Sequence, residues 1–444
     1  MSTHPQLSSP SSTTPQPAPS PRGSLGRVVV IGGNGFLGHH IVSQAVSSPL
    51  WTTDAVISVD LRCRHNRIDG ASYHECDITD APKLEALLVS LAPDVVIHTA
   101  SPTLSGLHIN PDALFKKVNV DGTASVIAAC QAAAARGSVR ALVYTSSASV
   151  ISDNASDLRN ADESWPVIRG ALQNEYYSET KAQAEQLVLE ANRRRPSASS
   201  SSSSSSFVSL TTTDSAAAAA AAASPPPSRP PLLTTALRPA GIFGEGDVQN
   251  MAGFMRAYRT NKHRVQLGDN TNIFDFTYVG NAAHAHLVAA HALLLTSRAS
   301  TAPLDHEKVD GEVFFVTNDS PVYFWDFARA VYRAAGNPEG TERVWRLSRS
   351  TSLLLGSLSQ AAYALVNRPA TFTRTRAVLS NMTRYYNITK AKTVLGYEPL
   401  WTLQEGVERG VRWFREQEER EAEKGSLVDA TAAVAAKKPL AANG

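Results

Sequence analysis

The side chains best suited to acid–base chemistry lie in one short segment, Tyr177-Ser178-Glu179-Thr180-Lys181. Tyr177 and Lys181 are four positions apart, so on a helix both side chains lie on one face. A nearby ammonium favours the phenolate, which lowers the tyrosine pKa and lets the phenol act as a base near neutral pH. This spacing also arises often by chance, so its meaning depends on the rest of the chain.

Ser147 is the third candidate and lies in Tyr144-Thr145-Ser146-Ser147-Ala148, about 30 residues before Tyr177. Residues 140–147 are predicted to form a strand. A hydroxyl at the carboxyl end of a parallel strand lies over the crevice in which open α/β sheets bind ligands. Alone, Ser147 would be interpreted as a turn residue. With Tyr177 and Lys181, it is predicted to hydrogen-bond and orient the reacting oxygen.

A glycine-rich turn follows the first predicted strand, at 28–31, and Gly32, Gly35 and Gly38 have the spacing G-x-x-G-x-x-G. The strand–turn–helix context is that of a dinucleotide fingerprint. Gly32 permits the tight turn, Gly35 lets backbone approach a pyrophosphate, and Gly38 lets helix and strand pack closely. The helix expected from Phe36 and Leu37 offers free N–H groups and a positive dipole end to phosphates. By itself, the motif also fits a structural turn in another α/β protein.

An acidic residue at the end of the second predicted strand, 55–59, supports nucleotide binding. Asp60 is placed to hydrogen-bond the adenosine ribose and to repel a 2′-phosphate, which favours NAD over NADP. Arg62 and Arg64 weaken that preference, because arginine can bind a 2′-phosphate. The other predicted cofactor contacts are Asp77 and Ile78 beside the adenine, Ala100 after a strand at 94–99, Lys181 on the nicotinamide ribose, and Pro239 after a strand at 232–237.

The elements that must position these residues alternate between strand and helix. Further strands are predicted at 140–147 and 310–316, and helices at 82–91, 112–135, 177–195 and 323–335. Such alternation indicates βαβ units. We therefore expect an α/β fold, a Rossmann-type doubly wound parallel sheet with a smaller C-terminal substrate-binding part.

Composition divides the chain into one folded domain and three flanking or inserted segments. Residues 1–24 are predicted to be a disordered tail, 197–231 a low-complexity disordered insertion, and 417–444 a charged, Ala-rich tail. The domain covers 25–416. Its cofactor core is expected mainly in 25–196 and 232–290, and its substrate part mainly in 240–270 and 310–416.

Charge and cysteine content exclude some classes of protein. A net charge of +2 without a dense Lys/Arg stripe argues against a nucleic-acid partner. Three cysteines without C-x-x-C spacing indicate a reducing compartment and argue against a disulfide frame or zinc site. His284 and His286 have no third ligand nearby in the sequence, so we interpret them as helix-surface histidines and predict no metal site.

In their order along the chain, these features resemble the extended short-chain dehydrogenase/reductase family. The resemblance rests on the glycine-rich turn, Ser147 with Tyr177 and Lys181, Arg238-Pro239 and the segment 275–281, and covers nearly all of 26–416 outside the insertion. It implies hydride transfer at a carbinol or carbonyl carbon, or epimerisation, with a bound nicotinamide.

The C-terminal half resembles the 3β-hydroxysteroid and sterol dehydrogenase branch of that family. The similar segments are 312–327, with Thr317-Asn318-Asp319 and Phe324-Trp325-Asp326-Phe327, and 384–400. Similarity is greatest to the sterol-4α-carboxylate 3-dehydrogenases (decarboxylating). This implies NAD-dependent oxidation of the 3β-hydroxyl of a 4α-carboxysterol, with loss of the carboxylate as CO₂, in sterol biosynthesis.

Three alternatives stay open at this point. Neither composition nor residue spacing distinguishes a 3β-hydroxysteroid dehydrogenase/Δ5-isomerase from a decarboxylating sterol-4α-carboxylate dehydrogenase. A nucleotide-sugar epimerase or dehydratase shares the upstream motifs, although the apolar stretch 353–366 does not suit a diphosphate substrate. An NAD-sensing regulatory protein would be expected to lack the tyrosine or the lysine.

Residues 353–366 are apolar but too few to span a bilayer. They fit a core or lid helix, or a helix at a membrane interface or at the mouth of an apolar pocket. With no visible signal peptide, the resemblance predicts a peripheral protein on the cytosolic face of the endoplasmic reticulum membrane. A homodimer and a complex with other enzymes of sterol C4 demethylation are also expected.

Overall fold

The computed structural model describes residues 21–102, 111–194, 231–301, 303–337, 340–365 and 372–436. The predicted insertion at 197–231 therefore lies outside the described residues, except for Pro231. Residues 1–20 of the predicted N-terminal tail also lie outside them.

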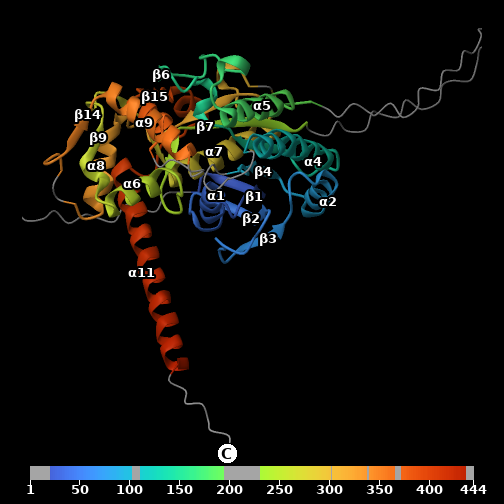
Figure 1. Ribbon diagram of the computed structural model, residues 1–444. Helices are drawn as coiled ribbons and strands as arrows, with labels where there is room; N and C mark the ends of the chain where they lie inside the picture. The colour runs from blue at the N-terminus through green and yellow to red at the C-terminus, as the bar shows by residue number, and fades with distance from the viewer. Residues whose placement is uncertain are drawn as a thin grey trace, which may run out of the picture.

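A seven-stranded sheet forms the centre of the molecule (Figure 1). All its neighbouring strands pair in parallel. The strand order reverses direction between β1 and β4, which is the topological switch point of a doubly wound fold. The predicted Rossmann-type fold is therefore confirmed. From one edge to the other, the strands are β12 (Val313–Val316), β7 (Leu233–Pro239), β5 (Ala141–Thr145), β4 (Val95–His98), β1 (Gly23–Ile31), β2 (Trp51–Asp60) and β3 (Ala71–Glu75).

Helices cover both faces of this sheet, and the alternation of side chains along β1 shows why. Val28 and Val30 pack on one face with helices α1 (Phe36–Ser47) and α7 (Val279–Arg298). Val29 and Ile31 pack on the other face, against a second set of three helices. Since successive strand residues point to opposite faces, a continuous apolar strand needs helices on both sides. The second set is α2 (Ala81–Leu91), α4 (Thr123–Ala135) and α5 (Tyr176–Glu190).

The helix predicted at 112–135 is interrupted. It begins as α3 (Pro111–Phe115), passes through a π-helical segment, η1 (Lys116–Gly122), and continues as α4. A Cβ added at Gly122 would lie 2.6 Å from Ile78 Cδ1, so the absence of a side chain at Gly122 lets this turn approach the segment after β3 closely. π-bulges of this kind occur frequently at functional sites.

The smaller part of the molecule is built around a four-stranded sheet with the order β13 (Val322–Tyr323), β10 (Ile273–Phe274), β15 (Arg384–Tyr386) and β6 (Leu158–Ala161). It lies beside one edge of the main sheet (Figure 1). Two short strand pairs and four helices complete it. They are β8 (Gly241–Phe243) with β11 (Phe276–Tyr278), β9 (Val265–Leu267) with β14 (Trp345–Leu347), α6 (Asn250–Arg259), α8 (Phe324–Ala334), α9 (Arg349–Leu365) and α10 (Arg374–Leu379).

The boundaries differ from the sequence-based division in three places. β12 is an edge strand of the main sheet, so 313–316 belongs to the cofactor core and not to the substrate part. β1 begins at Gly23, inside the predicted tail, because it pairs with β2 from Trp51 onward. The tail predicted from residue 417 begins as a helix, α11 (Leu403–Ala436), which extends away from the rest of the molecule (Figure 1).

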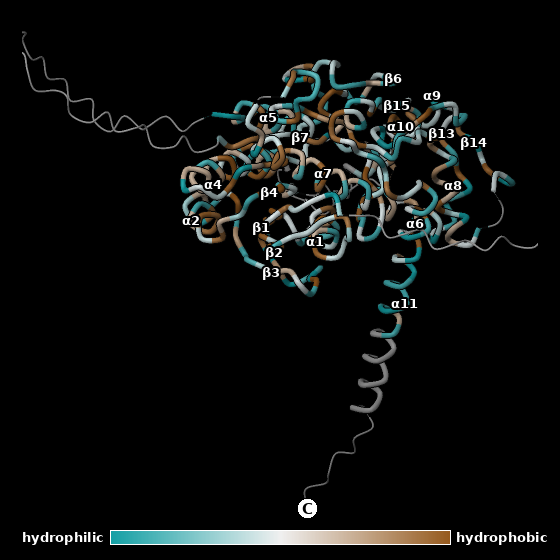
Figure 2. The backbone as a smooth tube through the Cα atoms, turned by 180° about the vertical axis from the view of Figure 1, so that it is seen from behind, coloured by the Kyte–Doolittle hydropathy of each residue, from teal (hydrophilic) through white to brown (hydrophobic). Residues whose placement is uncertain are grey.

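The hydropathy of the backbone follows the same layout. Apolar residues concentrate around β1, β4 and α7, whereas the first turns of α11 are hydrophilic where this helix leaves the body (Figure 2). Glu, Arg and Lys are good helix formers, which explains why a segment with little apolar content stays helical. No helix of the described residues is long and apolar enough to cross a membrane.

Candidate active site

The glycine-rich turn lies between β1 and α1, and its packing leaves no room for a Cβ at several of its glycines. Gly32 has φ +83°, and its N–H donates to the Val59 carbonyl at 2.7 Å. A Cβ at Gly32 would lie 2.7 Å from the Ala100 nitrogen, so the predicted contact Ala100 lies directly against the turn. A Cβ at Gly38 would overlap the Gly32 carbonyl oxygen, which accounts for the third glycine of the motif.

Gly33 is a fourth required glycine that the sequence analysis did not single out. A Cβ there would overlap Ser58 Oγ and lie 2.9 Å from the Val30 carbonyl oxygen. The doubled Gly32-Gly33 was the available signal. Gly35, in contrast, is exposed, and a Cβ there would meet only the Gly32 carbonyl, at 3.2 Å. Gly35 is therefore the place where a ligand can approach the backbone.

These features fit a dinucleotide pyrophosphate. Helix α1 begins at Phe36 directly after Gly35, and no side chain caps its N-terminus. The first N–H groups of a helix have no partner within the helix, and the dipole adds a partial positive charge there. Phe36 is half-buried and Leu37 is buried, so Leu37 fixes the helix to the core while the turn faces outward.

Asp60 ends β2 as predicted and is held next to the turn. Its Oδ2 accepts the Asn34 N–H at 3.0 Å, and its Oδ1 accepts the Leu61 N–H at 2.7 Å. Asn34 also binds the loop after β2, because its Nδ2 donates to the His65 carbonyl. Each carboxylate oxygen keeps a second lone pair for a ribose hydroxyl. Arg62 and Arg64 are exposed on the same loop.

Asp77 and Ile78 follow β3. Asp77 is exposed, and the backbone N–H and the hydroxyl of Thr79 lower the pKa of its carboxyl by hydrogen bonding. Ile78 is buried against Gly122 of the π-helical segment. The two residues therefore lie at the same edge of the sheet as Asp60, with Ile78 forming part of the wall.

Ser147 and Tyr177 come together from two different elements. Ser147 caps the short helix η2 (Ala148–Ile151), and its Oγ accepts the Ser149 N–H at 3.2 Å. Tyr177 lies in the first turn of α5, with its ring edge-on to Phe115. Burial, and secondly the Glu175 carboxylate, raise the pKa of Tyr177 to about 12, although hydrogen bonding with the Ser101 and Ser147 hydroxyls lowers it.

Lys181 is one turn further along α5 and is buried. Its Nζ donates to the Thr145 carbonyl at 2.7 Å and to the Tyr144 hydroxyl at 3.4 Å. Burial lowers the pKa of Lys181 to about 7, although the Glu185 carboxylate raises it. The Lys181 ammonium is thus directed to the end of β5. The expectation was that its charge lowers the pKa of Tyr177. In this structure burial has the largest effect on that pKa, and it raises it.

Two buried histidines surround the lysine. His286 hydrogen-bonds Thr145 Oγ1 and the Ala282 carbonyl, both at 2.7 Å, and His98 hydrogen-bonds Thr123 Oγ1 at 3.0 Å. Burial lowers the pKa of His98 to about 3 and of His286 to about 4, so both rings are neutral near pH 7. Because both histidines are neutral, they add no positive charge beside the Lys181 ammonium.

The prediction that His284 and His286 lie on a helix surface was wrong. Both are fully buried, because α7 packs along the sheet and presents them inward. Within the described residues, no group of three or more His, Cys, Asp and Glu side chains is placed to hold a metal ion.

A buried ion pair supports α5 from the neighbouring strand. Arg238 donates to both carboxylate oxygens of Glu185, at 2.9 and 2.6 Å, and each side chain is 3% exposed. Pro239 follows as the last residue of β7. The pair holds α5 in a fixed position against the sheet. Tyr177 and Lys181 lie on this helix, so their positions are fixed as well.

Asn119 is a site residue that sequence reasoning missed. It lies in the π-helical segment, donates to Thr180 Oγ1 at 3.0 Å, and accepts from Ser101 Oγ at 2.9 Å. This buried amide therefore connects α5 to the loop after β4. The segment Asn119-Val120-Asp121-Gly122-Thr123 carried the only signal, since glycine interrupts an otherwise regular helix.

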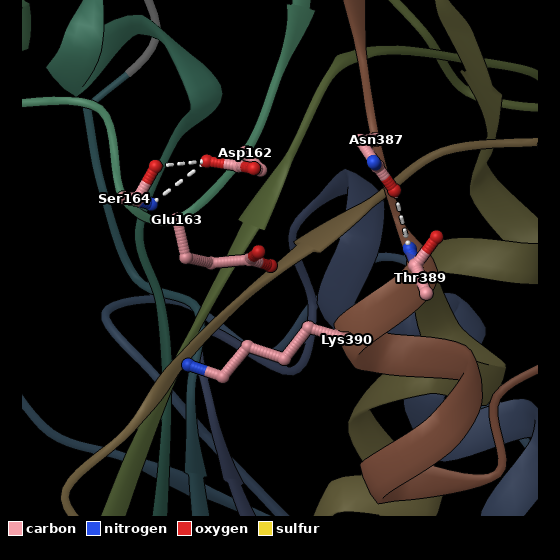
Figure 3. Close-up of a pocket in the computed structure, with 6 residues that line it drawn as sticks. All are labelled: Asp162, Glu163, Ser164, Asn387, Thr389 and Lys390. Atoms are coloured by element: carbon pink, nitrogen blue, oxygen red, sulfur yellow. Dashed lines mark hydrogen bonds between the residues drawn. The ribbon is translucent and has the colours of Figure 1, made fainter. Parts of the chain in front are cut away.

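A pocket of about 370 Å³ is lined by a different set of residues (Figure 3). Its polar groups are already paired: Glu163 accepts the Phe315 N–H at 2.7 Å, and Lys390 donates to Glu312 at 2.7 Å. Phe315 belongs to the edge strand β12 and Glu312 directly precedes it, so both contacts support the edge of the main sheet. The pocket is lined by Asp162, Glu163, Ser164, Asn387, Thr389 and Lys390.

Comparison with known proteins assigns the family. The model of the 3-beta hydroxysteroid dehydrogenase/isomerase family matches residues 29–201 and 219–349. The chain belongs to this family. Sterol-4-alpha-carboxylate 3-dehydrogenase, decarboxylating, of Saccharomyces cerevisiae is 36% identical over 88% of this chain and 98% of its own length. The human protein of that name is 32% identical over 88% of each chain.

Solved structures agree with the fold. UDP-glucose 4-epimerase of Thermus thermophilus, in complex with NAD, superimposes with a TM-score of 0.55 at 19% identity, over 88% of this chain and 99% of that one. The resemblance inferred from the sequence motifs is thus confirmed, and this family member is a dehydrogenase that uses a nicotinamide cofactor.

Proposed function

We propose that this chain oxidises the 3β-hydroxyl of a 4α-carboxysterol to the 3-ketone, with NAD as oxidant, and that the C4 carboxylate leaves as CO₂. The observation that carries the proposal is the meeting of Ser147 and Tyr177 at the carboxyl edge of the sheet, with Lys181 one turn away. The substrate class follows from decarboxylating relatives that match nearly the full chain.

Each residue has a defined task in this reaction. The Ser147 hydroxyl orients the substrate oxygen, and Tyr177 takes the proton of the 3β-hydroxyl. Lys181 is fixed by the Thr145 carbonyl and holds the cofactor ribose. The bound nicotinamide supplies the acceptor for the hydride from C3. Tyr177 and Lys181 lie on one face of α5 because of their spacing, and the Arg238–Glu185 pair anchors that helix against the sheet.

Loss of CO₂ needs no further functional group from the protein. Oxidation makes C3 a carbonyl that is β to the carboxylate. The C4–carboxylate bond then breaks, its electron pair enters the enolate of that carbonyl, and a proton adds at C4. The protein has only to hold the C3 oxygen, and Ser147 and Tyr177 are placed to do so.

The choice of NAD over NADP rests on Asp60. Its carboxylate lies against the glycine-rich turn, where a 2′-phosphate would meet its negative charge. Arg62 and Arg64 lie on the exposed loop that follows, so the expected preference is for NAD without complete exclusion of NADP.

One assay separates the substrate classes. Purified protein is incubated with NAD and either a 4α-carboxysterol or the matched sterol without the carboxylate, and NADH and CO₂ are measured. NADH with equimolar CO₂ from the first substrate supports the proposal. Turnover of only a Δ5-steroid without a C4 carboxylate, with enone formation, would instead support the dehydrogenase/isomerase activity.

We also propose that α9 attaches the protein to a membrane, on the cytosolic face of the endoplasmic reticulum. Leu354, Leu355 and Leu358 are exposed on this helix, and Trp345 nearby in the sequence is 76% exposed. No Asp or Glu lies between Glu342 and Glu398, whereas arginines and lysines recur there. Exposed leucines among cations suit an interface with anionic lipid.

Vesicle sedimentation tests this attachment. Phosphatidylcholine vesicles with phosphatidylserine should bind the protein, and binding should fall when Leu354, Leu355 and Leu358 are all changed to serine. A variant with Leu295→Ser and Leu304→Ser, two exposed leucines outside α9, is the control and should bind normally. Equal binding of all three proteins would contradict the proposal.

The remaining partners are also proposals. A homodimer and a complex with other enzymes of sterol C4 demethylation follow from the family resemblance alone. Light scattering of the purified protein tests the homodimer. Co-purification with tagged protein from membranes tests the complex with other enzymes. A monomer at micromolar concentration would remove the homodimer.

A further inference from the structure

One row of residues crosses the small sheet, and it is apolar except for an arginine. Phe274 of β10 pairs with Arg384 of β15, and Arg384 pairs with Leu158 of β6. Toward the other edge, Val322 of β13 pairs with Phe274. Residues that pair across neighbouring strands have their side chains on the same face of the sheet. Arg384 is therefore a cation placed among three apolar side chains.

The face that carries this row is turned toward the reacting centre. Tyr386 lies two residues after Arg384 and on the same face of β15. Its ring stacks on Phe315 of the main sheet with the ring centres 4.8 Å apart, and its hydroxyl donates to the Ala148 carbonyl at 3.4 Å. Ala148 directly follows Ser147 in the chain. The row thus faces the cofactor core on the side where Ser147 lies.

The Arg384 side chain is held in this position by its neighbours. Its Nε donates to the Tyr386 hydroxyl at 2.6 Å, so two hydrogen bonds connect the guanidinium to the residue after Ser147. Asp275 fixes the strand itself, because its N–H donates to the Arg384 carbonyl at 2.9 Å and its Oδ2 accepts the Tyr386 N–H at 2.8 Å. The position of the guanidinium is therefore set by both backbone and side-chain contacts.

The charge of Arg384 is not balanced by the protein. Over the ranges that the structure describes, its side chain hydrogen-bonds only Tyr386 and forms no ion pair with a carboxylate. The side chain is partly exposed, so its two terminal nitrogens are open to a ligand. Arg238, in contrast, donates to both carboxylate oxygens of Glu185.

We propose that Arg384 binds the 4α-carboxylate of the substrate and so selects sterols that carry this group. The proposal rests on the function proposed above and adds the residue that recognises the carboxylate. C4 is bonded to C3, so a substrate whose C3 oxygen lies at Ser147 has its carboxylate close to that residue as well. Phe274 and Val322, the partly buried apolar members of the row, suit the hydrocarbon around the carboxylate.

The physical chemistry of the substrate calls for such a cation. A sterol enters an apolar site with its hydrocarbon, and a carboxylate that loses water there is unfavourable unless a charged partner replaces the water. The guanidinium is planar and presents parallel N–H groups that match the two oxygens of a carboxylate. Two parallel hydrogen bonds would fix the orientation of the carboxylate as well as its position.

The expected contribution of Arg384 is to binding and not to bond cleavage. As the C4–carboxylate bond breaks, the negative charge moves to the enolate oxygen on C3, and CO₂ leaves without charge. The ion pair with Arg384 is therefore strongest in the bound substrate. Loss of this pair should raise KM for the carboxysterol, with a smaller change in kcat and with CO₂ still equimolar to NADH.

Binding of a ligand that cannot react tests the proposal directly. The probes are a 4α-carboxysterol without the 3-hydroxyl and its methyl ester, which has nearly the same shape but no charge. In the presence of NAD, the wild-type protein should bind the acid about tenfold or more tightly than the ester. Arg384→Gln should remove this difference by raising the Kd of the acid alone, and Arg384→Lys should restore part of it. Calorimetric titration measures these Kd values.

Two further variants separate recognition from structural effects. Tyr386→Phe keeps the ring on Phe315 but removes the hydroxyl that positions Arg384, so it should raise the Kd of the acid less than Arg384→Gln does. Arg346→Gln is the matched control. It removes the same charge from an exposed residue of β14, outside the row, and should leave both Kd values unchanged. An equal rise for acid and ester in Arg384→Gln, or no rise for either, would overturn the proposal.

This experiment separates the role of Arg384 from the proposed reaction, because the probes bind without turnover. Binding of the acid that depends on Arg384, without formation of NADH from a 4α-carboxysterol, would contradict the proposed reaction and support the carboxylate site. Turnover of a 4α-carboxysterol by Arg384→Gln with the wild-type KM would support the reaction and overturn the role of Arg384.

Discussion

At the scale of single residues, Tyr177 carries the clearest prediction. Tyr177→Phe removes the phenol that meets Ser147 and leaves the ring packed against Phe115. We expect kcat to fall at least 100-fold, the lower range for loss of a general base, with cofactor binding nearly intact. Stopped-flow NADH formation and calorimetric cofactor titration measure the two quantities. A variant with normal turnover would contradict the assignment of Tyr177.

Lys181 predicts a pH dependence of stability. Its pKa is about 7 in the folded protein, lowered by burial, and about 10.4 in an unfolded chain. Between these values the unfolded state binds more protons, so Lys181 lowers the free energy of unfolding most at pH 7 and below, and this penalty is relieved as the pH rises toward 10.

Lys181→Met removes this titration, so it is the comparison needed. The difference in free energy of unfolding, wild type minus Lys181→Met, should increase between pH 7 and pH 9.5 in urea melts. Thr145 and Tyr144 keep their positions in both proteins as part of β5. A difference that is constant over this range would show that Lys181 stays charged in the folded state.

At the scale of elements, the strands of the main sheet were predictable because each is a local apolar run. The predicted strand at 94–99 is found as β4 at Val95–His98, and the predicted helix at 82–91 as α2. Tyr177 and Lys181 were also predictable, since their spacing alone places them on one helix face. These features depend on the sequence of one segment only.

The contacts between distant segments were not predictable. The small sheet joins β6 to β15 across more than 200 residues, with strands of two to four residues each. Too few residues lie in each strand to show an alternating pattern. The Glu185–Arg238 pair and the inward orientation of His286 depend in the same way on how α5 and α7 dock, which no local pattern encodes.

The end of β2 carries the prediction for cofactor selection. Asp60→Asn keeps an oxygen for the Asn34 N–H but removes the charge, whereas Asp60→Ala removes both. We expect NAD affinity to fall roughly tenfold in Asp60→Ala, about 1.4 kcal/mol, and selection against NADP to relax in both variants. Kd values for NAD and NADP from fluorescence titration measure this. An unchanged ratio of the two Kd values would remove Asp60 from the site.

At the scale of the whole molecule, the low-complexity segment interrupts the chain between α5 and β7 without separating them. The Arg193 N–H donates to the Leu232 carbonyl at 2.9 Å, so the two sides of the segment lie at hydrogen-bonding distance. The Arg193 guanidinium binds Asp310, and Asn192 accepts the Thr234 N–H, which hold both sides to the sheet. The fold therefore needs only a short connection here.

Deleting residues 197–230 and inserting four Gly/Ser residues should thus leave the active site intact. Closing a shorter loop costs less entropy, so we expect the free energy of unfolding to rise by about 1 kcal/mol. The kcat and the cofactor Kd should match those of the full chain, because Tyr177 and Lys181 lie on the far part of α5 from Arg193. Urea melts and steady-state kinetics of the two proteins test this. If the shortened protein folds but loses turnover, the segment has a direct task in catalysis, and its treatment as an insertion in the domain would be wrong.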